Sequence, residues 1–277
     1  MPIAEISPGV KLHYESDDYT DPWIRPDCVL MLHGIAESAG AWRMWVPHFA
    51  RKYRVVRPDL RGFGQSSGLG GQVPKDVGLW ADDIDALVNG LGCGRVHVIG
   101  TKLGALVGME LARRRVPWMK TMTIAGLLIS PKKAIGPWVP EWKKHIDEKG
   151  MESWARLTMP GRMGDAISKE ANEWWVREMA AAPPESVKAC LTMVAEVGEA
   201  EDLEKVAVPT LVLVSSGRKS AGSDFEQRQS VDAVDRFRSR IPVSELATIE
   251  ATSYHVAATH PDACAQRVLR FIESNGG

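Results

Sequence analysis

The chain has 277 residues, of which 44% are hydrophobic and 25% are charged. It is long enough to bury a sizeable core, and its composition is that of an ordinary globular protein. A formal net charge of -1 argues against a nucleic-acid or anionic-membrane partner. Residues 1–5 lack a basic region followed by an apolar one, and no apolar run of about 18 residues occurs. We therefore expect a cytoplasmic protein with no membrane partner.

Cysteine spacing argues against a metal or redox centre. The four cysteines lie far apart in the sequence and form no C-x-x-C pair; they are Cys28, Cys93, Cys190 and Cys264. Zinc sites and thiol redox motifs usually place cysteines close together. We expect neither a metal site nor a cofactor.

The first half of the chain alternates between predicted strands and helices. Residues 3–16 have an alternating pattern around a Pro-Gly pair, which predicts a hairpin. The continuous apolar run at 28–32 is typical of a strand buried on both faces of a parallel sheet, and a second strand is predicted at 53–56. Apolar positions at helical spacing between 80 and 91 predict a helix, and another strand follows at 96–99. This alternation predicts an α/β fold with a mostly parallel central sheet and helices on both faces.

A very tight turn follows the strand at 96–99. Gly100 and Gly104 bracket it, and apolar residues then recur at helical spacing up to Leu111. This is the spacing of the G-x-S-x-G nucleophile elbow, a strained turn that raises one side chain above the sheet. The raised residue here is Lys102 instead of serine.

The second half contains a long segment without strand signals. A strand is predicted near 122–129, but residues 131–200 have no sheet-like run and are rich in tryptophan and methionine. Strands are predicted again at 208–214 and near 245–249, with a helix around 225–238 between them.

Four motifs in order carry a resemblance to a known family. They are His33-Gly34, the run at 59–66, the turn from Gly100 to Gly104, and Ser253-Tyr254-His255 ahead of Pro261. With them the chain resembles an α/β-hydrolase-fold protein over roughly residues 10–274. The resemblance implies a core domain made of 1–130 and 201–277, and a helical cap insertion at 131–200.

The resemblance also implies part of an active site. His255 takes the place of the catalytic histidine, and the backbone N–H groups of Ile35 and Leu103 take the places of the oxyanion hole. The serine nucleophile is replaced by Lys102. The loop after Val214 has no carboxylate where the family's acid usually falls, and Asp224 is the nearest acid downstream.

Three roles for Lys102 follow from amine chemistry. A neutral, desolvated lysine can form a Schiff base with a ketone. A protonated one can donate a proton or face an anionic intermediate as a fixed charge, with His255 activating water. The third role is none, in a relative that binds a ligand without turning it over. An acyl-lysine route is disfavoured because its amide is far harder to hydrolyse than a seryl ester.

Further residues are candidates for substrate contact. Glu37 is a candidate partner of Lys102, although a loop carboxylate of this kind is expected to be exposed. Trp138 and Trp142 from the cap would contact an apolar or aromatic substrate, and an inward-facing Arg218 would favour an anionic one.

The sequence therefore predicts an enzyme that cleaves a carbonyl compound of modest size: an ester, a lactone or a β-dicarbonyl. Lys102 and His255 stand at its centre, and the expected partner is a small molecule with a carbonyl or carboxylate. A homodimer is left open. The alternatives are a catalytically inactive ligand-binding relative, or an ester or C–C bond hydrolase in which serine was replaced by lysine through engineering.

Overall fold

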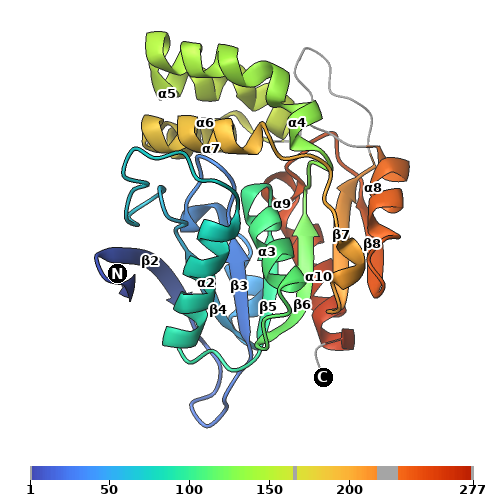
Figure 1. Ribbon diagram of the computed structural model, residues 1–277. Coiled ribbons are helices and arrows are strands. Elements are labelled where there is room, and N and C mark those ends of the chain that lie inside the picture. Colours follow the sequence, from blue (N-terminus) through green and yellow to red (C-terminus); the bar gives the residue numbers. More distant parts are fainter. Residues whose placement is uncertain (1, 165–166, 217–229, 276–277) are drawn as a thin grey trace.

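The structure, a computed structural model, describes residues 2–164, 167–216 and 230–275. A single eight-stranded sheet runs through the molecule in the order β1-β2-β4-β3-β5-β6-β7-β8 (Figure 1). The strands are β1 (Ile3–Ser7), β2 (Val10–Asp17), β3 (Cys28–Leu32), β4 (Arg54–Pro58), β5 (Val96–Gly100), β6 (Met119–Ala125), β7 (Thr210–Ser215) and β8 (Ser244–Ile249). The predicted α/β class is confirmed.

Most neighbouring strands pair in parallel. Among the described strands, the pairs β1 with β2 and β2 with β4 are antiparallel, and the first of these confirms the predicted hairpin. In the register of β3 with β5, Leu32 lies opposite Gly100. The two strands therefore end at the same level, and the loop that begins at His33 lies beside the turn that contains Lys102.

Helices cover both faces of the sheet. The α-helices of the core are α1 (Val46–Phe49), α2 (Gly78–Gly90), α3 (Leu103–Arg113), α8 (Val231–Arg238), α9 (Val256–Thr259) and α10 (Pro261–Asn275), with short 3₁₀ helices η1 (Ala39–Trp42) and η3 (Leu203–Lys205). Figure 1 shows α2 and α3 in front of the sheet and α10 behind it.

Alternate residues of the central strands supply two separate cores. In β3, Leu30 and Leu32 belong to the core under α2 and α3, whereas Val29 and Met31 belong to the core under α1 and α10. This alternation follows from the period of two in a strand. It explains why the sequence of β3 is apolar throughout.

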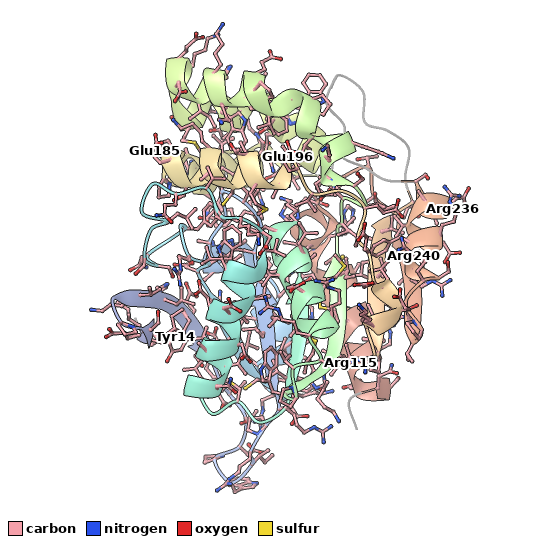
Figure 2. The ribbon with its side chains drawn as sticks, viewed as in Figure 1. Tyr14, Arg115, Glu185, Glu196, Arg236 and Arg240 are labelled. Carbon is pink, nitrogen blue, oxygen red and sulfur yellow. The ribbon has the colours of Figure 1, made fainter. Side chains whose placement is uncertain are left out.

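A helical insertion lies over the carboxyl ends of the parallel strands (Figure 1). It contains α4 (Pro131–Ala134), η2 (Gly136–Trp138), α5 (Val139–Met163), α6 (Lys169–Ala180) and α7 (Pro184–Val194). Gly150, with φ 81° and ψ 171°, breaks α5 into two helical parts. The charged side chains of Glu185, in α7, and Glu196, just after α7, are exposed (Figure 2). The insertion occupies the position predicted for a cap, and its boundaries stay a prediction.

One strand ends earlier than expected. β6 ends at Ala125, whereas the apolar pattern extended the strand to residue 129. Gly126 has φ +82° and turns the chain away, so residues 127 and 128 line a cavity instead of the sheet. For the helix expected around 225–238, residues 225–229 lie outside the described residues.

Within the described ranges, no helix is both long and apolar enough to cross a bilayer.

Candidate functional site

The turn between β5 and α3 has the geometry of a nucleophile elbow. Lys102 has φ 52° and ψ -114°, a strained conformation for a residue with a side chain. Its backbone N–H donates to the carbonyl of Gly126 at 3.1 Å. A Cβ at Gly104 would lie 2.1 Å from the carbonyl oxygen of Leu32, so only glycine permits this approach of helix and strand.

The raised side chain of Lys102 is paired with a buried carboxylate. Its Nζ lies 2.5 Å from Glu37 Oε1, and Glu37 Oε2 accepts the backbone N–H of Gly34 at 2.9 Å. Glu37 is only 3% exposed, so the expectation of an exposed carboxylate was wrong. A Cβ at Gly34 would lie 2.8 Å from Lys102 Cδ. The missing side chain at Gly34 therefore makes room for the ion pair.

His255 lies on the other side of the same carboxylate. Its Nε2 is 3.1 Å from Glu37 Oε1, although neither ring nitrogen makes a well-aligned hydrogen bond to a described residue. The ring packs against Trp175 at 5.3 Å between centroids and is 2% exposed. Its backbone N–H donates to the carbonyl of Arg162 at 3.1 Å, which links the histidine loop to the cap.

Burial and neighbouring charges shift the pKa values of all three groups. For Lys102, burial and the Arg162 cation outweigh the Glu37 anion and lower the pKa to about 8. For His255, burial and the Lys102 cation lower the pKa to about 4. Burial alone would raise the pKa of Glu37, but Lys102 and His255 hold it well below its usual range. At neutral pH the cluster is a lysine cation, a glutamate anion and a neutral histidine.

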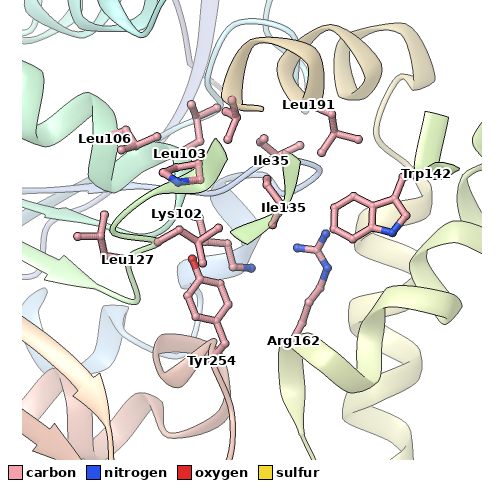
Figure 3. A pocket seen from close by; sticks show the side chains of 13 residues that line it. Ile35, Lys102, Leu103, Leu106, Leu127, Ile135, Trp142, Arg162, Leu191 and Tyr254 are labelled. Atoms are coloured by element: carbon pink, nitrogen blue, oxygen red, sulfur yellow. The ribbon is translucent and has the colours of Figure 1, made fainter. Parts of the chain in front are cut away.

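Lys102 also lines a mostly apolar cavity beneath the cap. The cavity has a volume of about 40 Å³, which is room for only a few water molecules. Its other lining residues are Ile35, Leu103, Leu106, Leu127, Leu128, Pro131, Ile135, Trp142, Arg162, Leu191, Val194 and Tyr254 (Figure 3). Ile35 and Leu103, the predicted oxyanion-hole residues, thus border the same space as the lysine. Among the described residues, neither of their N–H groups donates to a backbone carbonyl.

Some of the remaining predicted residues line the cavity and others do not. Trp142 lines the cavity and is 3% exposed, whereas Trp138 is only partly buried and does not line it. Glu37 and His255 lie behind Lys102 and do not line the cavity either. Arg218 and Asp224 lie outside the described residues.

Two polar residues of the cavity were missed from the sequence. Tyr254 stands next to His255 in the Ser253-Tyr254-His255 motif, so its place in the sequence is a usable signal. Arg162 lies near the end of α5, and nothing in the sequence indicates which face of that helix points inward. In the ranges 2–164, 167–216 and 230–275, no group of three or more His, Cys, Asp or Glu residues is arranged to hold a metal ion.

Comparison with known proteins identifies the family. A family model described as alpha/beta hydrolase fold matches residues 27–178, more than half of the chain. The chain belongs to the α/β-hydrolase fold family.

The individual relatives have low sequence identity to this chain or match only part of it. A pimeloyl-[acyl-carrier protein] methyl ester esterase from Aeromonas hydrophila is 25% identical over 261 residues, which cover 89% of this chain and 95% of the relative. Epoxide hydrolase 3 from Xenopus tropicalis is 32% identical over 107 residues, but these span only 38% of this chain and 28% of the relative's length.

Solved structures agree on the fold. The enol-lactonase from Burkholderia xenovorans superposes with a TM-score of 0.83 and 18% identity, covering 98% of this chain and 100% of the other. A thermophilic esterase from Thermogutta terrifontis gives a TM-score of 0.81 at 23% identity, with 96% and 94% covered. At these identities the likeness shows the fold alone.

Proposed function

We propose that the protein is an enzyme that cleaves a small carbonyl compound, an ester, lactone or β-dicarbonyl, by a mechanism without a serine nucleophile. The observation that carries this proposal is the Lys102–Glu37 ion pair, 2.5 Å long, at the position where the fold presents its nucleophile. The name of the methyl ester esterase relative supports an ester among these substrates.

The cation at the elbow suits a reaction in which oxygen gains negative charge. Attack of water on an ester, lactone or β-diketone carbonyl creates an oxyanion, and a β-diketone also releases an enolate. A protonated Lys102, with the amides of Ile35 and Leu103 beside it, would stabilise that charge. The carboxylate of Glu37 keeps the amine protonated at neutral pH, which argues against Schiff-base formation as the main route.

His255 is the candidate base. With a pKa of about 4 it is neutral at pH 7 and can accept a proton from attacking water. The water oxygen then bonds to the carbonyl carbon, the C–O or C–C bond breaks, and the protonated imidazole returns the proton to the leaving group. Glu37, 3.1 Å from Nε2, would stabilise the imidazolium in between. This sequence requires the substrate or cap to admit water beside His255.

The surroundings of Lys102 support the proposal that lysine is the natural residue at this position. With serine at this position, the buried Glu37 carboxylate would lose its nearest cation, and a buried unpaired carboxylate is costly. Gly34 leaves room for the lysine side chain. These features are easier to explain if the site evolved with lysine than if lysine was introduced to disable a serine enzyme.

A ligand-binding protein without turnover is the second candidate. It is favoured by one observation: among the residues that line the cavity, neither His255 nor Glu37 is present. A ligand in this cavity would meet Lys102 but not the base.

The test is turnover of a panel of short esters, lactones and β-diketones by three proteins: wild type, Lys102→Met and Lys149→Met. Lys149 is an exposed cap residue, so its variant controls for the loss of a lysine. We expect Lys102→Met to lose about 10²- to 10³-fold in kcat and Lys149→Met to match wild type. Undiminished turnover by Lys102→Met would overturn the mechanism, and binding without turnover by wild type would favour the second candidate.

A further inference from the structure

The charged side chains that line the cavity are of one sign. Among the described residues that line it, Lys102 and Arg162 are cations and none is an aspartate or glutamate. Arg162 comes from the cap and Lys102 from the sheet, and Figure 3 shows both side chains extending to the same space. A ligand in this cavity therefore meets positive charge from both layers.

Arg162 is buried without an anionic partner among the described residues. It is 4% exposed, its Nε donates to Thr158 Oγ1 at 3.2 Å, and its guanidinium lies over the Trp154 ring at 5.3 Å from the centroid. None of these contacts is to a carboxylate. The charge of Glu37 acts on Arg162 from a distance and raises its pKa against the effect of burial, but among the described residues Glu37 forms its ion pairs with Lys102 and His255 instead. A guanidinium is always charged and carries five donors, which match a carboxylate in a two-pronged arrangement.

The charges of the buried cluster do not cancel. Lys102 and Arg162 contribute two positive charges and Glu37 one negative charge, while His255 is neutral because its pKa is lowered to about 4. In the described part of the chain, one positive charge thus remains uncompensated beneath the cap. Buried charges are stable only when paired, so a monoanionic ligand would supply the missing counterion.

A further donor at the cavity is unused. The hydroxyl of Tyr254 is buried and has no hydrogen-bond partner among the described residues. Burial raises the pKa of this phenol, so it remains a neutral donor. The ammonium, the guanidinium and the phenol all offer hydrogens to the cavity, which is otherwise apolar.

We propose that Arg162 binds a carboxylate of the substrate, so that the protein acts on keto acids or on esters and lactones that carry a free carboxylate. This inference rests on the proposed function for the identity of the reacting carbonyl. The carboxylate lies at Arg162 under the cap, and the carbonyl oxygen lies at Lys102 and the amides of the elbow. The small volume and apolar walls favour a short chain between the two groups.

Binding measurements test this independently of turnover. By isothermal titration calorimetry, 4-oxopentanoate is compared with 4-oxopentanamide, which has the same skeleton without the charge. We expect wild type to bind the acid at least about tenfold more tightly than the amide, the range of a hydrogen bond to a charged group. Equal affinity of wild type for the two ligands would overturn the proposal without any variant.

Variants then assign the preference to a residue. We expect Arg162→Gln to lose the preference for the acid while its affinity for the amide changes less than twofold, and Arg162→Lys to recover part of it. Arg156→Gln, an exposed arginine on the same helix, serves as the matched control and should behave as wild type. The double variant Lys102→Met/Glu37→Gln should keep the preference, because Arg162 remains.

The outcomes separate the two proposals. Loss of the preference in Lys102→Met/Glu37→Gln but not in Arg162→Gln would place the anion at Lys102 and overturn this inference. A preference that depends on Arg162 in a protein that turns over no carbonyl compound would support the anion site and reject the enzyme. Turnover of neutral esters with no preference for the acid would support the enzyme and reject the anion site.

Discussion

Lys102 and Glu37 form an ion pair of 2.5 Å at the centre of the site, and the side chains are 10% and 1% exposed respectively. Both charges are buried, and burying either one without its partner would cost free energy. The ion pair is thus a structural requirement as well as a candidate catalytic device.

The pair should show strong coupling in stability. We expect Glu37→Gln to lower the free energy of unfolding by roughly 3 kcal/mol, because it leaves the Lys102 ammonium buried without its anion. The double variant Lys102→Met/Glu37→Gln should be less destabilised than the sum of the single variants, as measured by urea unfolding. Glu204→Gln, at an exposed position, is the control. Additive losses would contradict a coupled pair.

Gly34 should be intolerant of even a methyl group. A Cβ there would meet Lys102 Cδ at 2.8 Å and the two carboxylate oxygens of Glu37 at 3.1 and 3.2 Å. We expect Gly34→Ala to displace the ion pair and to lower turnover by about tenfold or more, with the fold retained by circular dichroism. Gly90→Ala meets no atom within 4 Å and should leave turnover unchanged. Equal activity of the two variants would mean that the ion-pair geometry is unimportant for the reaction.

The pH dependence of kcat/KM follows from the two shifted groups. Activity needs protonated Lys102 and neutral His255, so the rate should fall above pH about 8 and below pH about 4. In Arg162→Gln the upper limit should move to higher pH, because a cation that lowers the pKa of Lys102 has been removed. A rate that rises through pH 8 would instead indicate a neutral amine as the reacting form.

Stability should also fall in mild acid. Burial and Lys102 lower the pKa of His255 from 6.5 to about 4, so between these values the unfolded state binds more protons than the folded state. The free energy of unfolding should therefore decrease as pH falls through this window, by about 3 kcal/mol in total. Urea unfolding between pH 6.5 and 5 isolates this effect from Glu37, whose titration lies lower. Burial also lowers the pKa of His97 from 6.5 to about 4, so this histidine adds a similar slope. His255→Gln should therefore lose about half of the slope, and an unchanged slope would assign it to His97 and other groups.

The sequence predicted the backbone arrangement of the site better than the side-chain contacts within it. The spacing of Gly100 and Gly104 was sufficient to place Lys102 on an elbow, because the close approach of β5, β3 and α3 leaves no room for side chains there. The pairing of β3 with β5 then explains why the loop after His33 reaches the lysine. These are local or sheet-level rules that are visible in the pattern.

Glu37 and Arg162 show where such prediction ends. A carboxylate in a polar loop is usually solvated, and what buries Glu37 is a contact with Lys102, 65 positions later in the chain. The inward position of Arg162 depends on how α5 bends at Gly150 and rests on the sheet domain. Helical periodicity does not distinguish a buried cation on the inner face of a cap from a solvated one.

The most direct test of the central claim is the intact mass of the protein during turnover in the presence of borohydride, with Lys102→Ala as the control. If Lys102 acts as a cation, substrate should be consumed while the wild-type mass stays unchanged, and Lys102→Ala should consume far less. A reduced adduct on wild type that is missing from Lys102→Ala would contradict the account and establish an imine-forming lysine.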